Sequence, residues 1–368
     1  VVPDPGAAAY IRLLVQTACA IGIAVGVSRI LYRMGEQLAR ARAMGSYHLV
    51  ELLGRGGMGE VWKATHQFLA RPAAVKLVRR DQLGEANEQG ATEVLQRFVR
   101  EAQATAALQS PHSVSVYDFG IARDGTFYYV MELLDGLDLN ALVRRDGPQP
   151  PERVVYILRQ ACRSLAEAHE RGLIHRDIKP PNLFLCRYAT EPDFLKVLDF
   201  GLAKNMDTSS RGEMQVTMVG MVAGTPGFIA PEAAAAVAEI DGRADLYALA
   251  CVAYWLLSGE EVFGGSSPMS ILVAHMRDDP SPLSSRAAQP IPAGLERVIM
   301  DCLEKDPARR PQTARELSAR LAALDLERLW TPARAEAWWA GYQAGRAPKA
   351  PADDVTTAPT RKVVTPDV

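Results

Sequence analysis

The sequence predicts an α+β fold in which a small β-rich part comes first and a larger, mainly helical part follows. Residues 47 to 53, 59 to 64 and 73 to 78 have the short apolar runs, two of them joined by a glycine turn, that are typical of strands. From Gly136 onward the apolar residues recur mostly at helical spacing. With 368 residues, of which 48% are hydrophobic, the chain is long enough to form one large two-lobed domain.

The remaining elements follow in order along the chain. Residues 93 to 108 predict one helix within the β-rich part, and residues 127 to 134 predict its last strand. Pro151 in a first turn and Gly172 at the end bound the first long helix of the second part. The other elements expected there are strand-like pieces at 183 to 186 and 195 to 198, a helix buried on all sides at 244 to 258, and helices at 295 to 304 and 313 to 323.

Composition narrows the class of protein. The formal net charge of -2 provides no basic excess of the kind that nucleic-acid binding needs, so no nucleic-acid partner is expected. The five cysteines are scattered and form no C-x-x-C pair, which argues against a zinc site or a disulfide framework. Reduced thiols in a cytoplasmic domain fit this pattern.

The two ends of the chain differ from the part between them. Residues 13 to 27 form an apolar segment that is shorter than the roughly 20 residues of a membrane span, and it could span only if residues 10 to 32 took part. A packed or surface helix and a signal-like segment are the alternatives for residues 1 to 45. If the segment does span, the arginines that follow it favour a cytoplasmic position for the downstream chain. Residues 346 to 368 are rich in Pro, Thr and charged residues and predict a disordered tail or linker.

A glycine-rich turn joins the first two predicted strands. It reads GRGGMGEV and places Gly54, Gly56 and Gly59 in G-x-G-x-x-G spacing. Glycines allow backbone amides to approach phosphate oxygens closely, although such a turn is also common in plain hairpins. Residues 60 to 64 continue as a strand, and this argues against a dinucleotide fingerprint, which needs a helix at that point.

Lys76 stands inside the apolar strand AAVKLV. A strand lysine can extend its charge to the solvent at a sheet edge, or it can be held against anionic phosphates by a carboxylate. Glu101, on the predicted helix that follows, is the natural partner for the second role.

The stretch IHRDIKPPN crowds charged and amide groups between apolar residues. Asp177 could accept a hydroxyl proton, Lys179 could steady a transferred phosphoryl group, and Asn182 could bind a metal through its amide oxygen. A second metal ligand is needed, and Asp199 in LDFG provides it at the end of an apolar strand.

Taken together, GRGGMGEV, AAVK, the helical Glu, HRDIKPPN, DFG and GTPGFIAPE resemble, in this order, the eukaryotic-like serine/threonine protein kinases of bacteria. The resemblance covers roughly residues 46 to 323. It implies a smaller β-rich N-lobe at 46 to 133 and a larger helical C-lobe at 134 to 323. ATP and Mg²⁺, with Mn²⁺ as an alternative metal, would occupy the cleft between the lobes.

The resemblance also implies roles for single residues. Lys76, paired with Glu101, would bind the ATP phosphates, Asp177 and Lys179 would be catalytic, and Asn182 and Asp199 would hold the metal. The implied ATP-binding positions are completed by Gly54, Gly56 and Gly59 over the phosphates, Leu53, Val61, Ala74 and Phe184 around the adenine, Met131 as gatekeeper, Glu132 and Leu134 in the hinge, and Asp138 at the ribose.

Further implied roles concern substrates and regulation. Lys179 and Thr225 point to protein substrates with Ser or Thr acceptors, and Arg176 is typical of kinases that need a phosphate on the activation loop. Thr217 is favoured over Thr208, Ser209 and Ser210 as the autophosphorylation site in the loop from 199 to 232. Glu232 would pair with a buried Arg310, and Asp245 would bind the backbone of the HRD turn.

The motif residues argue against two other classes of protein. A pseudokinase that acts as a scaffold or a nucleotide-responsive binding module usually lacks one of the residues Lys76, Asp177, Asn182 and Asp199, which are all present here. A small-molecule kinase of related fold is disfavoured by GTPGFIAPE. The aromatic extension at 324 to 345, with Trp330, Trp338, Trp339 and Tyr342, either docks on the C-lobe as an added helix or presents a surface for a partner.

Overall fold

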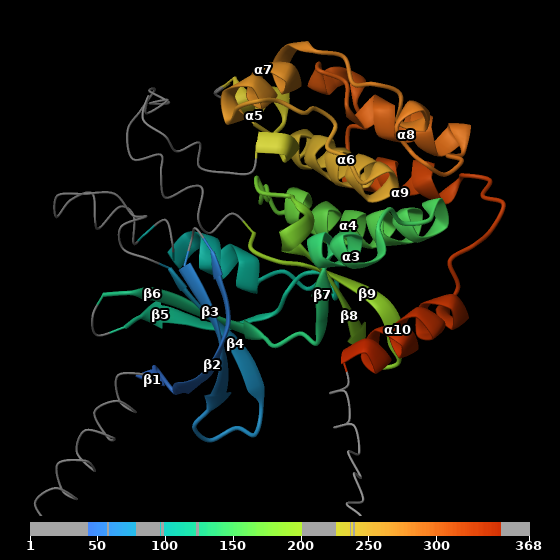
Figure 1. Ribbon diagram of the computed structural model, residues 1–368. Coiled ribbons are helices and arrows are strands. Elements are labelled where there is room, and N and C mark those ends of the chain that lie inside the picture. Colours follow the sequence, from blue (N-terminus) through green and yellow to red (C-terminus); the bar gives the residue numbers. More distant parts are fainter. Residues whose placement is uncertain are drawn as a thin grey trace, which may run out of the picture.

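The structure is a computed structural model of two lobes, a β-sheet with one helix and a larger helical body (Figure 1). It describes residues 43–56, 59–78, 96, 99–122, 125–200, 226–235, 237 and 240–346. The predicted α+β architecture with a small β-rich lobe and a large helical lobe is confirmed.

The N-lobe is built on an antiparallel sheet with the strand order β1-β2-β3-β4-β6-β5. Its central strands β4 and β6 are buried almost throughout, which explains why their sequences AAVKLV and FYYVME are nearly continuous apolar runs. Residues 99–106 are helical, and Ala102 packs among Val78, Tyr129 and Met131 of the sheet. The strands are β1 (Ala43–Met44), β2 (Tyr47–Gly56), β3 (Gly59–His66), β4 (Pro72–Val78), β5 (Val116–Ile121) and β6 (Phe127–Glu132).

The glycine turn forms the end of the β2–β3 hairpin, where Gly56 pairs with Gly59. Gly59 has a φ of +143°, and a Cβ atom at this position would lie 1.8 Å from the carbonyl oxygen of Leu77. Only glycine allows β3 to start so close to β4.

The C-lobe begins with a small sheet of three antiparallel strands, β7 (Gly136–Asp138), β8 (Leu183–Tyr188) and β9 (Glu191–Val197). Its helices are α3 (Leu139–Asp146), α4 (Pro151–Glu170), α5 (Pro231–Ala234), α6 (Arg243–Ser258), α7 (Pro268–Arg277), α8 (Ala293–Cys302) and α9 (Ala314–Ala322). Short 3₁₀ turns lie at η2 (Pro180–Asn182), η4 (Pro226–Phe228), η5 (Leu283–Ser285) and η6 (Pro307–Arg309).

Two helices form the centre of this lobe. In α4, Pro151 occupies the first turn, where its missing N–H costs no hydrogen bond. Helix α6 is buried on nearly all sides, as its sequence predicts, and it ends at Gly259, whose φ of 77° is in the left-handed region. Both helices pack in the same apolar cluster, which forms the core of the C-lobe.

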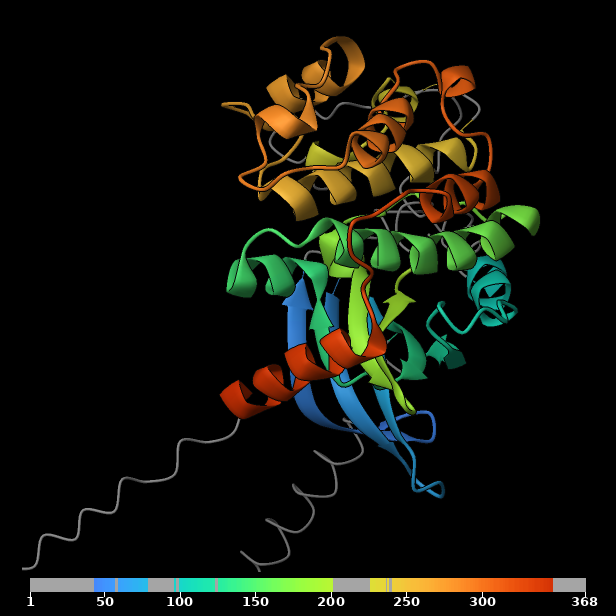
Figure 2. The same ribbon diagram turned by 90° about the vertical axis from the view of Figure 1, so that its right-hand side faces the viewer.

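The aromatic extension docks on the C-lobe as a helix, α10 (Pro332–Arg346), which lies across the small sheet (Figure 2). The Trp339 ring is 2% exposed, and its Nε1 donates a hydrogen bond of 2.7 Å to Asp193 Oδ1 in β9. Arg153 of α4 and the Trp330 indole bind the same Asp193 carboxylate. The docked alternative predicted for this segment is therefore confirmed.

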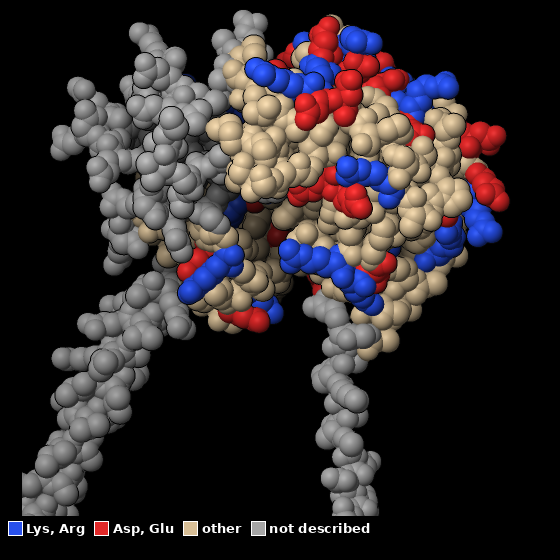
Figure 3. Space-filling model, turned by 45° about the horizontal axis from the view of Figure 1, so that its top comes forward, with Lys and Arg blue, Asp and Glu red and all other residues tan. Residues whose placement is uncertain are grey.

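Lys/Arg and Asp/Glu side chains are interspersed over the face of the C-lobe that Figure 3 shows, in line with the small net charge. Among the described helices, none has the length and apolar character that crossing a membrane would require. The predicted segment at residues 10 to 32 lies outside the described residues, as do Thr217, Thr225 and the tail after residue 346.

Candidate active site

A lysine from the N-lobe and an aspartate from the C-lobe form an ion pair at the junction of the lobes. Lys76 of β4 places its Nζ 2.6 Å from Oδ2 of Asp199, which follows β9 by two residues. The Tyr129 hydroxyl donates a hydrogen bond to the other oxygen of Asp199. Tyr129 is in register with Lys76 across the β4–β6 pair, so neighbouring strands supply both groups.

The environment of Asp199 keeps its carboxylate ionised. Burial alone would raise the pKa of Asp199, but the charge of Lys76 and the hydrogen bonds from Lys76 and Tyr129 outweigh burial and lower it. Burial and the adjoining Asp199 raise the pKa of Tyr129 well above its ordinary value. The site therefore offers an anionic ligand beside a neutral hydroxyl donor near neutral pH.

Asp177, Lys179 and Asn182 form a compact group in the loop before β8. Lys179 Nζ lies 2.8 Å from Asp177 Oδ2, and Asn182 Nδ2 donates a bond of 3.0 Å to the same oxygen. Asn182 Nδ2 also donates to the backbone oxygen of Asp177 at 2.8 Å, because the turn η2 brings residue 182 back toward residue 177. A carboxylate, a lysine and an amide are thus held within hydrogen-bond reach of one another, and a carboxylate placed in this way can act as a general base toward a hydroxyl.

Asp245 of α6 supports this loop from inside the C-lobe. It is 1% exposed and accepts bonds of 2.8 Å from the backbone amides of His175 and Arg176 and from His169 Nε2. Burial alone would raise the pKa of Asp245, but these hydrogen bonds and the neighbouring histidines lower it. Arg176 has a φ of 62°, and the Asp245 bonds hold this strained backbone in place. The predicted contact of Asp245 with the HRD turn is confirmed.

His175 connects the loop to the strand that leads to Asp199. Its Nε2 donates a hydrogen bond of 2.7 Å to the Leu198 oxygen, and its Nδ1 accepts one from the Asp177 amide at 3.3 Å. The ring lies 4.7 Å from the ring of the fully buried Phe200. The positions of Asp177 and Asp199 are therefore coupled through a single buried imidazole.

The oxygen atoms of Asn182 and Asp199 suit a magnesium ion. The backbone oxygen of Asn182 accepts a hydrogen bond of 2.9 Å from the Leu198 amide. Asp199 is the next residue after Leu198, so it lies close to Asn182. The Nδ2 of Asn182 binds Asp177, which leaves Oδ1 as the ligand atom of its amide. Among the described residues there is no cluster of three or more His, Cys, Asp or Glu that could hold a metal alone. A metal bound by one carboxylate and one amide must complete its shell with water and substrate phosphates, which is the usual behaviour of Mg²⁺.

The residues predicted around the adenine, as gatekeeper and in the hinge are distributed over three regions. Val61, Ala74 and Met131 meet in one apolar cluster of the N-lobe. Leu53 is half exposed on β2, and Leu134 is half-buried after β6. The roles predicted for these residues in binding ATP stay predictions.

Two further ATP-binding predictions involve residues with additional contacts. Asp138 pairs with Phe184 across β7 and β8, and its carboxylate also caps helix α3 by accepting a bond of 2.8 Å from the Ala141 amide. Glu101 is buried on the helix at residues 99–106. Its pairing with Lys76 stays a prediction, since the ion pair found for Lys76 is the one with Asp199.

The predicted pair of Glu232 and Arg310 is present in the C-lobe. The Arg310 guanidinium donates to both carboxylate oxygens of Glu232 at 2.7 and 2.8 Å, and the arginine side chain is fully buried. Arg310 also donates to three backbone oxygens, those of Arg243, Glu304 and Lys305. It thereby joins α5, α6 and the segment before η6.

Sequence reasoning missed two residues near this site. Tyr129 contacts Asp199. Pairing the two apolar strands β4 and β6 in register places Tyr129 opposite Lys76, and this pairing could have revealed that Tyr129 lies near the site. Lys196 is a fully buried lysine in the apolar strand before Asp199, and it pairs with Glu132 at 2.6 Å. A charge inside such a strand signals a buried partner.

The chain belongs to the protein kinase domain family, whose model matches residues 47–320. It is 38% identical over 283 residues to the serine/threonine-protein kinase pkn3 of Myxococcus xanthus, covering 77% of this chain and 50% of that protein. It is 40% identical over 278 residues to the serine/threonine-protein kinase PknB of Mycobacterium leprae, covering 75% of this chain and 42% of that protein. The chain thus spans about half, or less, of the length of these curated relatives.

Among solved structures, the fold is similar to the kinase domain of PknI from Mycobacterium tuberculosis, which was crystallised as a double mutant. The TM-score is 0.57 at 28% sequence identity, and the match covers 76% of this chain and 98% of the other. The family and the kinase fold that the motifs predict are therefore shown by independent comparisons.

Proposed function

We propose that this chain is an ATP-dependent serine/threonine protein kinase that transfers the γ-phosphoryl group of ATP to Ser and Thr hydroxyls of proteins. The main support is the meeting of Lys76 and Asp199 at 2.6 Å, beside the compact group of Asp177, Lys179 and Asn182. Of these residues, Lys76, Asp177 and Asp199 stand at the positions that a pseudokinase usually loses. Membership of the protein kinase family and relatives named serine/threonine-protein kinases support the same reaction class.

In this proposal each side chain has one task. Asp177 orients the acceptor hydroxyl and takes up its proton, while Lys179 steadies the phosphoryl group in transfer. Lys76 binds ATP phosphates, and Asn182 and Asp199 hold magnesium, or manganese in its place. The metal supplies positive charge that offsets the charge of the phosphates. Leu53, Val61, Ala74 and Phe184 enclose the adenine. Met131 is the gatekeeper, and the hinge backbone at Glu132 and Leu134 binds the edge of the base.

Regulation is proposed to act through the loop between Asp199 and Glu232. Arg176 precedes the catalytic Asp177, and a phosphate on Thr217 would balance its charge and order the loop. The acceptor would be this chain itself, by autophosphorylation, in addition to other proteins in bacterial signal transduction. An N-terminal segment at residues 10 to 32 that reaches a membrane would keep the kinase domain on the cytoplasmic side.

The test is transfer of labelled phosphate from ATP and magnesium to the chain itself and to a generic basic protein. Asp177→Asn should abolish the transfer, because it removes the carboxylate that acts on the hydroxyl. Asp241→Asn is the matched control, since Asp241 is exposed and pairs with Arg243 on the C-lobe surface. Label on Ser or Thr that the control keeps and Asp177→Asn loses is expected.

Phosphopeptide mapping then tests the regulatory part, with label on Thr217 as the expected result. A wild-type chain that binds ATP but transfers no label, even after treatment with an active kinase, would favour the pseudokinase. Transfer to a metabolite but to no protein would favour the small-molecule kinase.

A further inference from the structure

A buried ion pair lies at the hinge between the two lobes. Lys196 Nζ is 2.6 Å from Glu132 Oε1, and the exposed fractions of the two side chains are 1% and 11%. Glu132 is the last residue of β6, and Lys196 belongs to β9. The pair therefore connects the end of the N-lobe sheet to the strand that leads to Asp199.

The Glu132 carboxylate also binds a third segment. Its Oε1 accepts a hydrogen bond of 2.8 Å from the Ser115 amide, just before β5, and the Glu132 amide donates to the Ser115 oxygen at 3.0 Å. The chain beside Ser115 is in turn bonded to β9, since the Val114 amide donates to the Val197 oxygen at 3.0 Å. One carboxylate oxygen of Glu132, the last residue of β6, thus binds both β9 and the segment just before β5.

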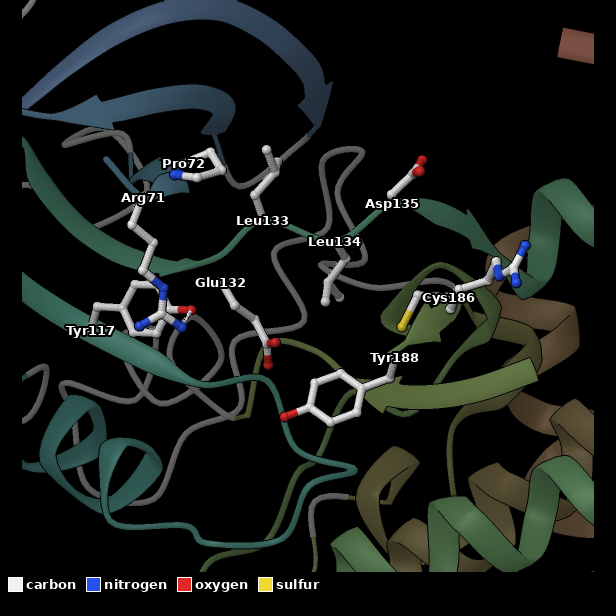
Figure 4. A pocket seen from close by; sticks show the side chains of 10 residues that line it. Arg71, Pro72, Tyr117, Glu132, Leu133, Leu134, Asp135, Cys186 and Tyr188 are labelled. Carbon is white, nitrogen blue, oxygen red and sulfur yellow. Dashed lines mark hydrogen bonds between the residues drawn. The ribbon is translucent and has the colours of Figure 1, made fainter. Parts of the chain in front are cut away.

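An open pocket borders the hinge on one side. A cavity of about 260 Å³ is lined by the hinge residues Glu132, Leu133, Leu134 and Asp135, together with residues of β8 and the N-lobe. In Figure 4 the Glu132 carboxylate is directed toward the side of this cavity that Tyr188 lines. On this side the hinge borders open space, and the ion pair of Glu132 with Lys196 ties the end of β6 to β9.

The surroundings of Lys196 keep it in one orientation. Its Nζ lies 4.6 Å from the centre of the Tyr188 ring and 3.5 Å from the Ser113 oxygen, in addition to its contact with Glu132. A fully buried ammonium needs such partners, because burying an unpaired charge is costly. The position of the Glu132 carboxylate is therefore determined by a lysine that is itself fully buried.

We propose that the Glu132–Lys196 pair positions the hinge backbone for the adenine of ATP and keeps it in register with Asp199. This inference rests on the proposed kinase function. Lys196 and the Glu132 carboxylate act as positioning residues, since the backbone around residue 132, not these side chains, would contact the base. The pair couples the place where the adenine would bind to β9, which ends two residues before Asp199, the proposed metal ligand.

The experiment compares Lys196→Met with the double variant Glu132→Gln/Lys196→Met in the full chain. The single variant leaves a carboxylate buried without its cation and should lower the Tm, whereas the double variant removes both charges and should recover most of that loss. If the pair positions the hinge, both variants should raise the KM for ATP about tenfold while kcat falls less than about threefold. The Kd for adenosine should rise as much as the KM for ATP.

Asp193→Asn is the matched control. Asp193 is also in β9, is fully buried and forms a paired contact with Arg153, but it faces the α10 side. This variant should lower the Tm without raising the KM for ATP. If Lys196→Met does not fold, the double variant carries the test alone.

The outcomes separate the two proposals. A KM that recovers together with the Tm in the double variant, or that rises equally in Asp193→Asn, would show a purely structural role and overturn the inference. A wild-type chain that neither binds adenosine nor transfers phosphate would overturn the proposed function instead. An active wild type with an unchanged KM in both hinge variants would overturn only the positioning role.

Discussion

The ammonium of Lys76 lies 2.6 Å from a carboxylate oxygen of Asp199, so the two lobes are joined by opposite charges at the point where they meet. In the proposed function the same two groups serve the two charged components of the substrate, phosphate and metal. On binding, the phosphates would give Lys76 a new partner and the metal would give Asp199 a new partner. The contact therefore keeps the Asp199 carboxylate ionised and holds both side chains in place in the chain alone.

Lys76→Met is expected to lower phosphoryl transfer by at least about two orders of magnitude, because a preorganised positive charge is lost. The pKa of Asp199 should also rise, since the Lys76 charge holds it down. Transfer rates at saturating ATP measure the first effect. Lys63→Met on the neighbouring strand β3 is the control, and it should keep most of the activity. Equal losses in the two variants would contradict a specific role for Lys76.

Arg310→Lys should lower the free energy of unfolding by about 3 kcal/mol, because it breaks a buried bidentate pair and leaves Glu232 partly unpaired. Arg309→Lys is a control one residue away. Arg309 has a side chain that is 69% exposed and pairs with Glu304 at the surface, so its replacement should cost less than about 1 kcal/mol. Urea unfolding of both variants measures the difference, and similar midpoints would argue against the importance of burial.

Features of the fold that depend on a local sequence pattern could be predicted from the sequence alone. The central strands β4 and β6 are buried on both faces, α4 has strong helical periodicity, and α6 is a long run that is apolar on nearly all sides, so their types could be predicted from the residues alone. The motif residues Asp177, Lys179 and Asn182 lie within one short loop, and their proximity follows from their spacing.

Contacts between distant segments could not be predicted in this way. Tyr129 and Asp199 are 70 residues apart, and Lys196 and Glu132 are 64 residues apart. Nothing in the local periodicity of either partner identifies the other, because the contact arises from how the two lobes and their sheets pack. Strand β1, with two residues, is too short to produce a pattern of its own.

Trp339→Phe should destabilise the chain by about 2 kcal/mol, since it removes a buried hydrogen bond to the charged Asp193 and leaves a small void. Trp338→Phe is the neighbouring control. Its indole donates to Asp146 at an exposed site, so a smaller loss is expected. Thermal unfolding measures both. A Tm that is equally insensitive to the two changes would indicate that α10 contributes little to the stability of the C-lobe.

The buried His275 is expected to make the free energy of unfolding depend on pH. Burial, followed by the positive charge of Lys305, lowers the pKa of His275 to about 4, and its Nδ1 lies 2.9 Å from the Tyr247 hydroxyl. In the unfolded chain the pKa returns to about 6.5, so between these values the unfolded state binds more protons. The stabilisation is therefore complete above about pH 6.5 and declines as the pH falls toward 4.

At pH 5 this contribution should be smaller than at pH 7 by about 2 kcal/mol. His275→Gln cannot titrate, so its free energy of unfolding should fall less between the two pH values than that of the wild type, even though it is less stable at neutral pH. His48→Gln, at an exposed position of β2, should retain the wild-type slope. Urea unfolding at both pH values measures the slopes, and equal slopes for all three proteins would mean that His275 does not remain neutral in the folded chain.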